Sequence, residues 1–179
     1  MLSVIIATND SERALVATLA ALVPGATAGV VREVIVADGA SRDETAQVAD
    51  IAGCRFFASD QPLGARLSTA AAMARGEWLM FLHPGAVPQP SWIDDVVAFV
   101  RQDHPRVAAF SPASTGIFTR VRRALALPRA DQGLVLRKSL YAELGGHRPD
   151  ARDPEADLLR RIGRARLTIL RSAIAQSDI

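Results

Sequence analysis

Polar segments follow four apolar runs in the first half of the chain, and their side chains suit nucleotide chemistry. The segments are Thr8-Asn9-Asp10, Asp38, Gly64–Arg66 and His83-Pro84-Gly85. A carboxylate can accept hydrogen bonds from a ribose or from a base edge. A glycine at a helix start lets the backbone approach an anion, and a neighbouring arginine adds positive charge. Together these segments indicate a site for a nucleotide and its diphosphate.

Asp38 and Arg66 each have a second interpretation that the sequence leaves open. A carboxylate at the end of a buried strand is costly unless it is hydrogen-bonded. Asp38 could meet that need with a base or ribose, or with backbone N–H groups of its own turn. The helix dipole disfavours a cation where Arg66 stands. Its presence there points to an anionic ligand, unless the side chain simply faces solvent.

Two common nucleotide motifs are missing from the sequence. The loop after the first apolar run has no G-x-G-x-x-G, and no G-x-x-x-x-G-K-[ST] occurs anywhere. These absences exclude the dinucleotide fingerprint and the P-loop. Cys54 is the single cysteine, which excludes an intramolecular disulfide and a cysteine zinc cluster.

Strands and helices must alternate to position these segments. Short apolar runs rich in β-branched residues predict buried strands, and between them the apolar spacing is helical. Such βαβ units form a parallel sheet, which binds ligands beyond the carboxyl ends of its strands. The predicted strands are Leu2–Thr8, Glu33–Asp38, Cys54–Ala58 and Glu77–Leu82. The predicted helices are Ser11–Val23, Ser41–Ile51 and Gly64–Arg75. The first ends before Pro24-Gly25, and the second begins with a capping box from Ser41 to Glu44.

The second half predicts further strands and helices of the same kind. The result is one α/β domain with a mostly parallel, doubly wound sheet and helices on both faces. The predicted strands are Arg106–Ser111, Gly133–Arg137 and Arg166–Leu170. The predicted helices are 91–102, Thr115–Leu127, Lys138–Leu144 and Asp153–Ile162.

Composition sets the class of protein. The chain has 179 residues, 49% hydrophobic and 22% charged, which predicts one globular domain. The net charge is +2, and the basic residues gather in the second half. A basic half could meet phosphates or an anionic membrane face, or could simply be a solvated surface. The first residues lack a basic secretory leader, and no apolar run reaches the roughly 20 residues of a membrane span. We therefore expect a cytoplasmic protein.

Four segments carry a family resemblance in their order and spacing. They are SVIIATND, EVIVADGASRDET, GARLSTAAAMARGEWLMFLHPGAVPQPSWID and ADQGLVLRKSLYAELGG. In this order they resemble the family 2 inverting glycosyltransferases of the GT-A fold, from residue 2 to about residue 170. The chain looks most similar to a small bacterial subgroup whose fourth strand ends in leucine-histidine-alanine-aspartate. The resemblance implies a single GT-A domain over 1–179, with 1–90 as the nucleotide-binding half and 91–179 as the sugar and acceptor half.

The resemblance also implies roles for individual residues. The nucleotide would be held by Thr8, Asn9, Asp10 and Asp38, with Arg66 near the diphosphate. His83 and Gly85 fall on the metal motif, usually Asp-x-Asp or His-x-Asp.

The resemblance places the sugar, the acceptor and the general base in the second half. Asp131 and Gln132 fall near the sugar and acceptor. Glu155 is the best match to the catalytic base, and Asp153 or Asp157 could take that place if the register shifts.

Two departures from the family pattern bear on catalysis. Gly85 replaces the aspartate that would bind manganese or magnesium, which puts the divalent metal in doubt. The enzyme could borrow a carboxylate such as Asp131, could neutralise the leaving group with arginines, or could be inactive. Glu155 is one methylene longer than aspartate, and a misplacement of about 1 Å can cost on the order of 100-fold in rate.

The expected partners are a UDP- or GDP-linked sugar and an unknown acceptor, and no nucleic acid. The basic segment Thr119–Arg129 could touch a membrane that carries a lipid-linked acceptor, or could be a solvated helix face. The main alternative function is an inactive relative that binds nucleotide or regulates a partner. A nucleotidyltransferase is a further alternative, although ATNDSE lacks the glycine-rich loop it needs. We expect His104 at a helix end, His147 in a loop, facing solvent rather than an acceptor, and Trp92 in the core.

Overall fold

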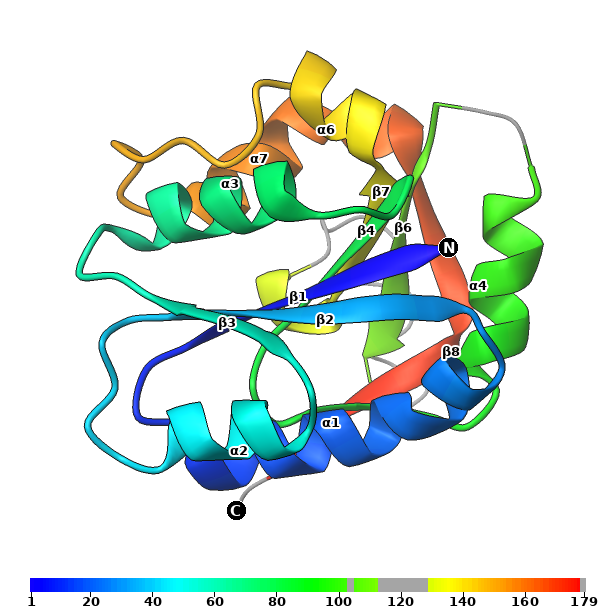
Figure 1. The fold of residues 1–179 in the computed structure, drawn as a ribbon. Coiled ribbons are helices and arrows are strands. Elements are labelled where there is room, and N and C mark those ends of the chain that lie inside the picture. The colour runs from blue at the N-terminus through cyan, green and yellow to red at the C-terminus, as the bar shows by residue number, and fades with distance from the viewer. Residues whose placement is uncertain (103–104, 113–128, 178–179) are drawn as a thin grey trace.

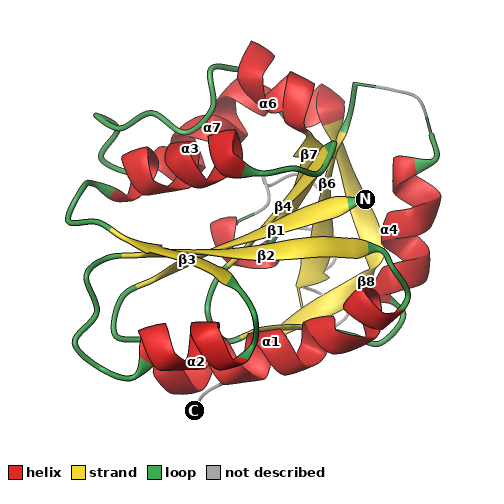
Figure 2. Cartoon of the chain, in the orientation of Figure 1, coloured by secondary structure: helices red, strands yellow, loops and turns green. Residues whose placement is uncertain are grey.

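An eight-stranded sheet with helices on both faces forms the protein (Figure 1, Figure 2). The computed structural model describes residues 1–102, 105–112 and 129–177. The strand order is β3-β2-β1-β4-β7-β6-β8-β5. The strands are β1 (Leu2–Thr8), β2 (Val31–Asp38), β3 (Arg55–Ala58), β4 (Trp78–Leu82), β5 (Ala86–Pro88), β6 (Val107–Pro112), β7 (Leu134–Arg137) and β8 (Leu167–Gln176). The helices are α1 (Glu12–Thr27), α2 (Thr45–Ile51), α3 (Leu63–Met73), α4 (Trp92–Val100), α6 (Lys138–Glu143) and α7 (Pro154–Ile162), with short 3₁₀ turns at Ala130–Gln132 and Arg164–Arg166.

The strand order reverses direction at β1, and this switch point places the polar segments together. β2 and β4 flank β1 as parallel neighbours, with Thr8 opposite Asp38 and Ile6 opposite Leu82. The carboxyl ends of these three strands therefore share one edge of the sheet, as predicted. β7 runs antiparallel to β4 and to β6, while β6 and β8 are parallel. The fold is the mostly parallel α/β sheet that the sequence indicates.

Alternating side chains on the buried strands supply two cores, one on each face of the sheet. Ile6 and its neighbours pack against α1, α2 and α4, and Ile5 and its neighbours pack against α3, α6 and α7. Figure 2 shows the two helical layers on opposite sides of the strands. The core assignment of Trp92 is confirmed, because this side chain is 1% exposed.

The predicted end of the first helix is wrong. Helix α1 continues through Pro24 to Thr27. A Cβ on Gly25 would lie 2.5 Å from the Trp92 ring, so the glycine lets the helix end pack closely against α4. The favourable free energy of this packing offsets the loss of one helical hydrogen bond, because Pro24 has no N–H to donate.

The predicted capping box at Ser41 and Glu44 is also wrong. Helix α2 begins at Thr45, and its N-cap residue Glu44 makes no side-chain capping bond. Ser41 instead donates its hydroxyl to Asp38. Two features were not predicted: β5, and the extension of β8 to Gln176, which pairs with Ala86 of β5.

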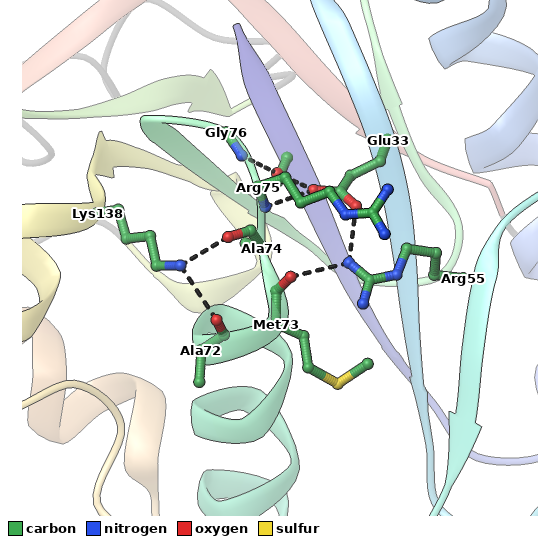
Figure 3. A network of polar contacts seen from close by, with 9 residues as sticks. Glu33, Arg55, Ala72, Met73, Ala74, Arg75, Gly76 and Lys138 are labelled. Carbon is green, nitrogen blue, oxygen red and sulfur yellow. Dashed lines mark hydrogen bonds and ion pairs between the residues drawn. The ribbon is translucent and has the colours of Figure 1, made fainter.

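A polar network closes the amino edge of the sheet, opposite the candidate site (Figure 3). Lys138 Nζ donates to the carbonyls of Ala72 (3.1 Å) and Ala74 (2.6 Å) at the end of α3. Arg55 donates to Met73 O (2.8 Å) and to Glu33 (2.9 Å). Two cations thus satisfy carbonyls that a helix C-terminus leaves without intrahelical partners.

Some predictions fall on residues that the structure does not describe. They are the helix over Thr115–Leu127, the role of His104 and most of the Thr119–Arg129 segment. Among the described residues, no helix combines the length and the apolar character needed to cross a bilayer.

Candidate functional site

Asp38 lies at the carboxyl end of β2 with its carboxylate bound by neighbouring side chains and backbone. Its Oδ1 accepts hydrogen bonds from Thr8 Oγ1 (2.7 Å) and Ser41 Oγ (2.5 Å), and its Oδ2 accepts one from the Ser41 N–H (2.7 Å). The residue is 1% exposed. One of the three donors is a backbone N–H of its own turn, as in the second interpretation of Asp38, and the other two are hydroxyl groups, one of them from Thr8 at the end of β1. Asp38 organises the loops at this edge from within.

Asp10 joins the loop after β1 to the loop after β2. Its N–H donates to Ser41 Oγ (2.8 Å), and its Oδ1 accepts from the Arg42 N–H (2.7 Å). Its backbone has a positive φ of 46°, a conformation that aspartate tolerates better than most residues. The neighbouring Asn9 is exposed at the same loop.

Arg66 extends from the first turn of α3 to the same edge. Its Nη1 donates to the carbonyls of Thr8 (3.0 Å), the last residue of β1, and of Ala37 (2.8 Å), the residue before the last in β2. Burial lowers the pKa of Arg66, and the nearby charge of Asp38 opposes that shift. The five residues predicted to bind nucleotide are therefore brought together, and part of the Arg66 guanidinium is used to tie the two strands.

Gly39 lets the backbone pass close to two of these polar side chains. A Cβ at this position would lie 3.0 Å from Asn9 Oδ1 and 3.2 Å from Arg66 Nη1 and Nη2. An amide oxygen and a guanidinium therefore flank a stretch of backbone without a side chain. Sequence analysis did not single out Gly39, although its place directly after a buried strand was a usable signal.

His83 and Glu155 are in direct contact at the neighbouring strand end. His83 directly follows β4, Glu155 lies in the first turn of α7, and His83 Nε2 is 2.8 Å from Glu155 Oε1. The His83 side chain is 37% exposed and the Glu155 side chain 19%. The hydrogen bond to Glu155 raises the pKa of His83, against the effect of burial, and the charges of Glu155 and Asp131 add to the rise.

A shallow hollow of about 20 Å³, open to solvent, lies beside this pair. Phe81, Leu134 and Leu159 form its apolar walls, and Gly133 also lines it. Arg129, His147 and Glu155 supply polar groups. The arrangement of one carboxylate and one cation at an apolar wall can orient a hydroxyl-bearing ligand and accept a proton from it.

The prediction that His147 faces solvent is wrong. His147 is 3% exposed, and its Nδ1 lies 2.9 Å from the hydroxyl oxygen of Tyr141. Its ring packs edge-on against Phe81 with centroids 4.9 Å apart. Burial lowers the pKa of His147 to about 4, so the ring is neutral at pH 7.

The other acidic candidates near Glu155 are used to stabilise α7. Asp153 is the N-cap residue, and its Oδ1 accepts from the Ala156 N–H (2.9 Å). Asp157 pairs with Arg161 (2.8 Å) and lies 3.9 Å from Arg148. Among the three acidic residues considered for the base, Glu155 is the one that lines the hollow.

Asp131 and Gln132 lie on the 3₁₀ turn before β7. Gln132 is 9% exposed; its Oε1 accepts from the Arg129 N–H (2.7 Å) and its Nε2 donates to Phe110 O (2.8 Å). Asp131 Oδ2 lies 3.5 Å from Arg129 Nε, and its backbone carbonyl accepts from Gln176 Nε2 (3.0 Å). Gln132 therefore shapes the loop that carries Arg129 to the hollow.

The residues of the metal motif do not fit a divalent cation. Gly85 has no side chain, and the Nε2 of His83 is already bonded to Glu155. Within residues 1–102, 105–112 and 129–177, no group of three His, Cys, Asp or Glu side chains could hold a metal ion. Mn²⁺ and Mg²⁺ prefer several oxygen ligands, and this donor set does not supply them.

Comparisons with known proteins agree with this fold. A family model described as Glycosyl transferase family 2 matches residues 3–151. A search of the curated proteins found no match.

Two similar solved structures are of named proteins. One is S. aureus TarS 1–349 in complex with UDP, with a TM-score of 0.78 and 17% identity. The other is glucosyl-3-phosphoglycerate synthase from Mycobacterium tuberculosis in complex with Mn²⁺, UDP and glucosyl-3-phosphoglycerate, with a TM-score of 0.72 and 19% identity. The matches cover 97% and 100% of this chain, and this chain spans 59% and 72% of those two. At these identities the likeness establishes the fold.

Proposed function

Because the family model matches residues 3–151 of 179, this chain belongs to glycosyl transferase family 2, and we propose that it transfers a sugar from a nucleoside diphosphate sugar to an acceptor hydroxyl with inversion. The observation that carries the proposal is the His83–Glu155 contact at the wall of the hollow. This contact lies at the same sheet edge as the Thr8–Asp38 pair. Such a transfer needs a carboxylate that is fixed in position to accept a proton, and a polar edge of the sheet that can bind the nucleotide.

Residues 1–90 are the nucleotide-binding half in this proposal. The nucleoside lies outside the backbone of Gly39, beside Asn9 and Arg66, while Thr8, Asp10 and Asp38 fix the loops beneath it. Backbone groups and an amide side chain can bind a base and ribose without a dedicated side chain at residue 39. UDP is the first candidate, since TarS and the synthase were both solved with UDP. A GDP-linked donor is the alternative.

Residues 91–179 are the sugar and acceptor half. Glu155 accepts the proton of the acceptor hydroxyl, whose oxygen attacks the anomeric carbon from the face opposite the diphosphate. The bond from that carbon to the diphosphate oxygen breaks, and the nucleoside diphosphate leaves with the electron pair. Asp131 and Gln132 hold the loop that faces the sugar, and Asp153 serves by capping α7.

Positive side chains offset the charge of the leaving group in this scheme. Arg66 lies at the nucleotide edge and Arg129 at the hollow. No step depends on a metal ion, because the donor set around His83 does not fit one. We further propose that Thr119–Arg129 contacts a membrane surface carrying a lipid-linked acceptor, on the strength of its arginines alone.

The test measures donor turnover on the full chain. UDP-glucose and GDP-mannose are offered with a panel of hydroxyl acceptors, and release of UDP or GDP is followed over time. We expect Glu155→Gln to lower turnover by about 100-fold or more, with UDP affinity unchanged within about threefold. Proton NMR of the product checks for inversion at the anomeric carbon. Nucleotide binding without turnover of any donor would support the inactive relative instead.

A further inference from the structure

We propose that His83 is a positioning residue that holds Glu155, at the place where the family resemblance implies a metal ligand. The proposal rests on the proposed function, since Glu155 is the base in that scheme. It differs from the expectation drawn from the sequence, in which His83 binds a metal.

The backbone at Gly85 directs any side chain away from the His83–Glu155 contact. Pro84 and Gly85 form a tight turn in which the Ala86 N–H donates to His83 O (3.1 Å), and Gly85 has a φ of +84°. A Cβ on Gly85 would meet Ser177 O at 3.3 Å and Gln176 Oε1 at 3.6 Å. A carboxylate there would face two oxygens at the end of β8, which disfavours it.

The C-terminal segment holds this turn in place. The Gly85 N–H donates to Ala14 O (2.9 Å), and the Ser177 N–H donates to Gly85 O (2.8 Å). Both backbone polar groups of Gly85 are therefore used by α1 and by the residue after β8. The segment that the family resemblance assigns to the metal motif, His83-Pro84-Gly85, is therefore a packed turn.

A further oxygen donor near His83, among the residues that the structure describes, is Asp131, and it is engaged with a cation. Its Oδ2 lies 3.5 Å from Arg129 Nε. Its Oδ1 is buried with no hydrogen-bond partner among the described residues, so it is the competing metal donor that a test must address. Asp131→Asn is the variant that removes it.

The two departures from the family pattern meet in one contact. Glutamate at position 155 is longer than aspartate by one methylene, and its carboxylate at the start of α7 lies 2.8 Å from a side chain at the end of β4. A flexible carboxylate has several rotamers, and a hydrogen bond to Oε1 selects one of them. Oε2 is then directed to the acceptor hydroxyl. With glycine at position 85 and glutamate at position 155, His83 therefore has a carboxylate partner in place of a metal ion.

Two substitutions at His83 separate positioning from metal binding. His83→Gln places an amide N–H close to where the imidazole Nε2 lies, and an amide is a poor ligand for Mn²⁺. His83→Asp supplies a hard oxygen ligand but sets a second carboxylate against Glu155. With EDTA present, we expect His83→Gln to keep kcat for the donor within about fivefold, and His83→Asp to lose about 100-fold in kcat with little change in KM.

A spectroscopic readout tests the same point without turnover. The chain has three histidines, so ring proton signals can be assigned from single substitutions. MnCl₂ is added to the wild-type chain with UDP, and line widths of His83 and the buried His147 are compared, then repeated in Asp131→Asn. We expect the His83 signal to keep its width at substoichiometric Mn²⁺, and to shift in Glu155→Gln.

Selective broadening of His83 at substoichiometric Mn²⁺, or recovery of His83→Asp activity by Mn²⁺, would overturn the positioning role. Absence of UDP and GDP binding in the wild type would instead overturn the proposed function. The His83 signal would still report its contact with Glu155 in that case, so the two failures are distinguishable.

Discussion

His83 Nε2 and Glu155 Oε1 lie 2.8 Å apart, although 72 positions separate the two residues in the chain. One was expected to bind a metal and the other to act as a base. Their contact makes them one unit at the wall of the hollow, and it links the end of β4 to the start of α7.

A double-mutant cycle measures this contact. His83→Ala, Glu155→Ala and the double variant are unfolded with urea at pH 6 and at pH 9. Because Glu155 raises the pKa of His83 in the folded state, the pair stabilises the protein below the unfolded pKa, and the gain is lost as pH rises through the folded pKa. We expect a coupling free energy of at most about 1 kcal/mol at pH 6, since both side chains are partly exposed, and less at pH 9. Equal coupling at both pH values would contradict the account.

His147 makes stability fall in acid. Its pKa is lowered by burial to about 4, against about 6.5 in an unfolded chain. The unfolded state therefore binds the proton first, and the free energy of unfolding decreases as pH falls from 6.5 toward 4. The expected loss is about 3 kcal/mol by pH 4. Urea unfolding of wild type and His147→Phe between pH 8 and pH 4 checks this. The free energy of unfolding of the variant should fall less steeply with decreasing pH, because only the carboxylates then contribute.

Asp38 has a measurable structural role. Replacement by Asn keeps the size but removes the charge that accepts three hydrogen bonds from Thr8 and Ser41. We expect Asp38→Asn to lower the free energy of unfolding by about 2 kcal/mol. Asp60→Asn, at an exposed position of the loop after β3, is the matched control and should change it little. If both variants unfold at the same urea concentration, the internal hydrogen bonds contribute less than the geometry implies.

Lys138, the single lysine of the chain, stabilises the end of α3. Lys138→Met retains the stem but leaves the carbonyls of Ala72 and Ala74 without this donor (Figure 3). We expect a loss of about 1–2 kcal/mol in chemical denaturation. Arg32→Met removes one exposed cation near the same edge of the sheet and should lose less than about 0.5 kcal/mol. A larger loss for Arg32→Met would point to net charge as the cause.

The local sequence pattern was sufficient to predict the strands of the sheet, but it was insufficient to predict which side chains contact one another. The apolar runs at Leu2–Thr8 and Trp78–Leu82 predicted strands because a fully buried strand is apolar on both faces. Ser41 shows the limit: Ser-x-x-Glu is a capping signal, but Asp38 lies three residues earlier and binds the same serine. Sequence spacing cannot decide between two local partners of nearly equal energy.

The candidate site was predicted residue by residue and not as an arrangement. The edge that gathers Thr8, Asp38 and Arg66 follows from the βαβ order. The contact between His83 and Glu155 depends on where α7 packs, and the pairing of β5 with β8 depends on a strand of three residues. Neither has a periodic signal in the sequence, since both come from tertiary packing.

The most direct test of the account is calorimetric titration of the full chain with UDP and with GDP, comparing wild type with Gly39→Ala. The added methyl crowds Asn9 and Arg66, while Gly53→Asn adds a side chain at the opposite edge, where a Cβ meets nothing within 4 Å and asparagine tolerates the φ of +68°. We predict that the wild type binds one of the two nucleotides, and that Gly39→Ala weakens its affinity by about tenfold, or about 1.4 kcal/mol, with Gly53→Asn unchanged. Equal affinity in all three proteins, or no binding by the wild type, would contradict a nucleotide site at this edge of the sheet.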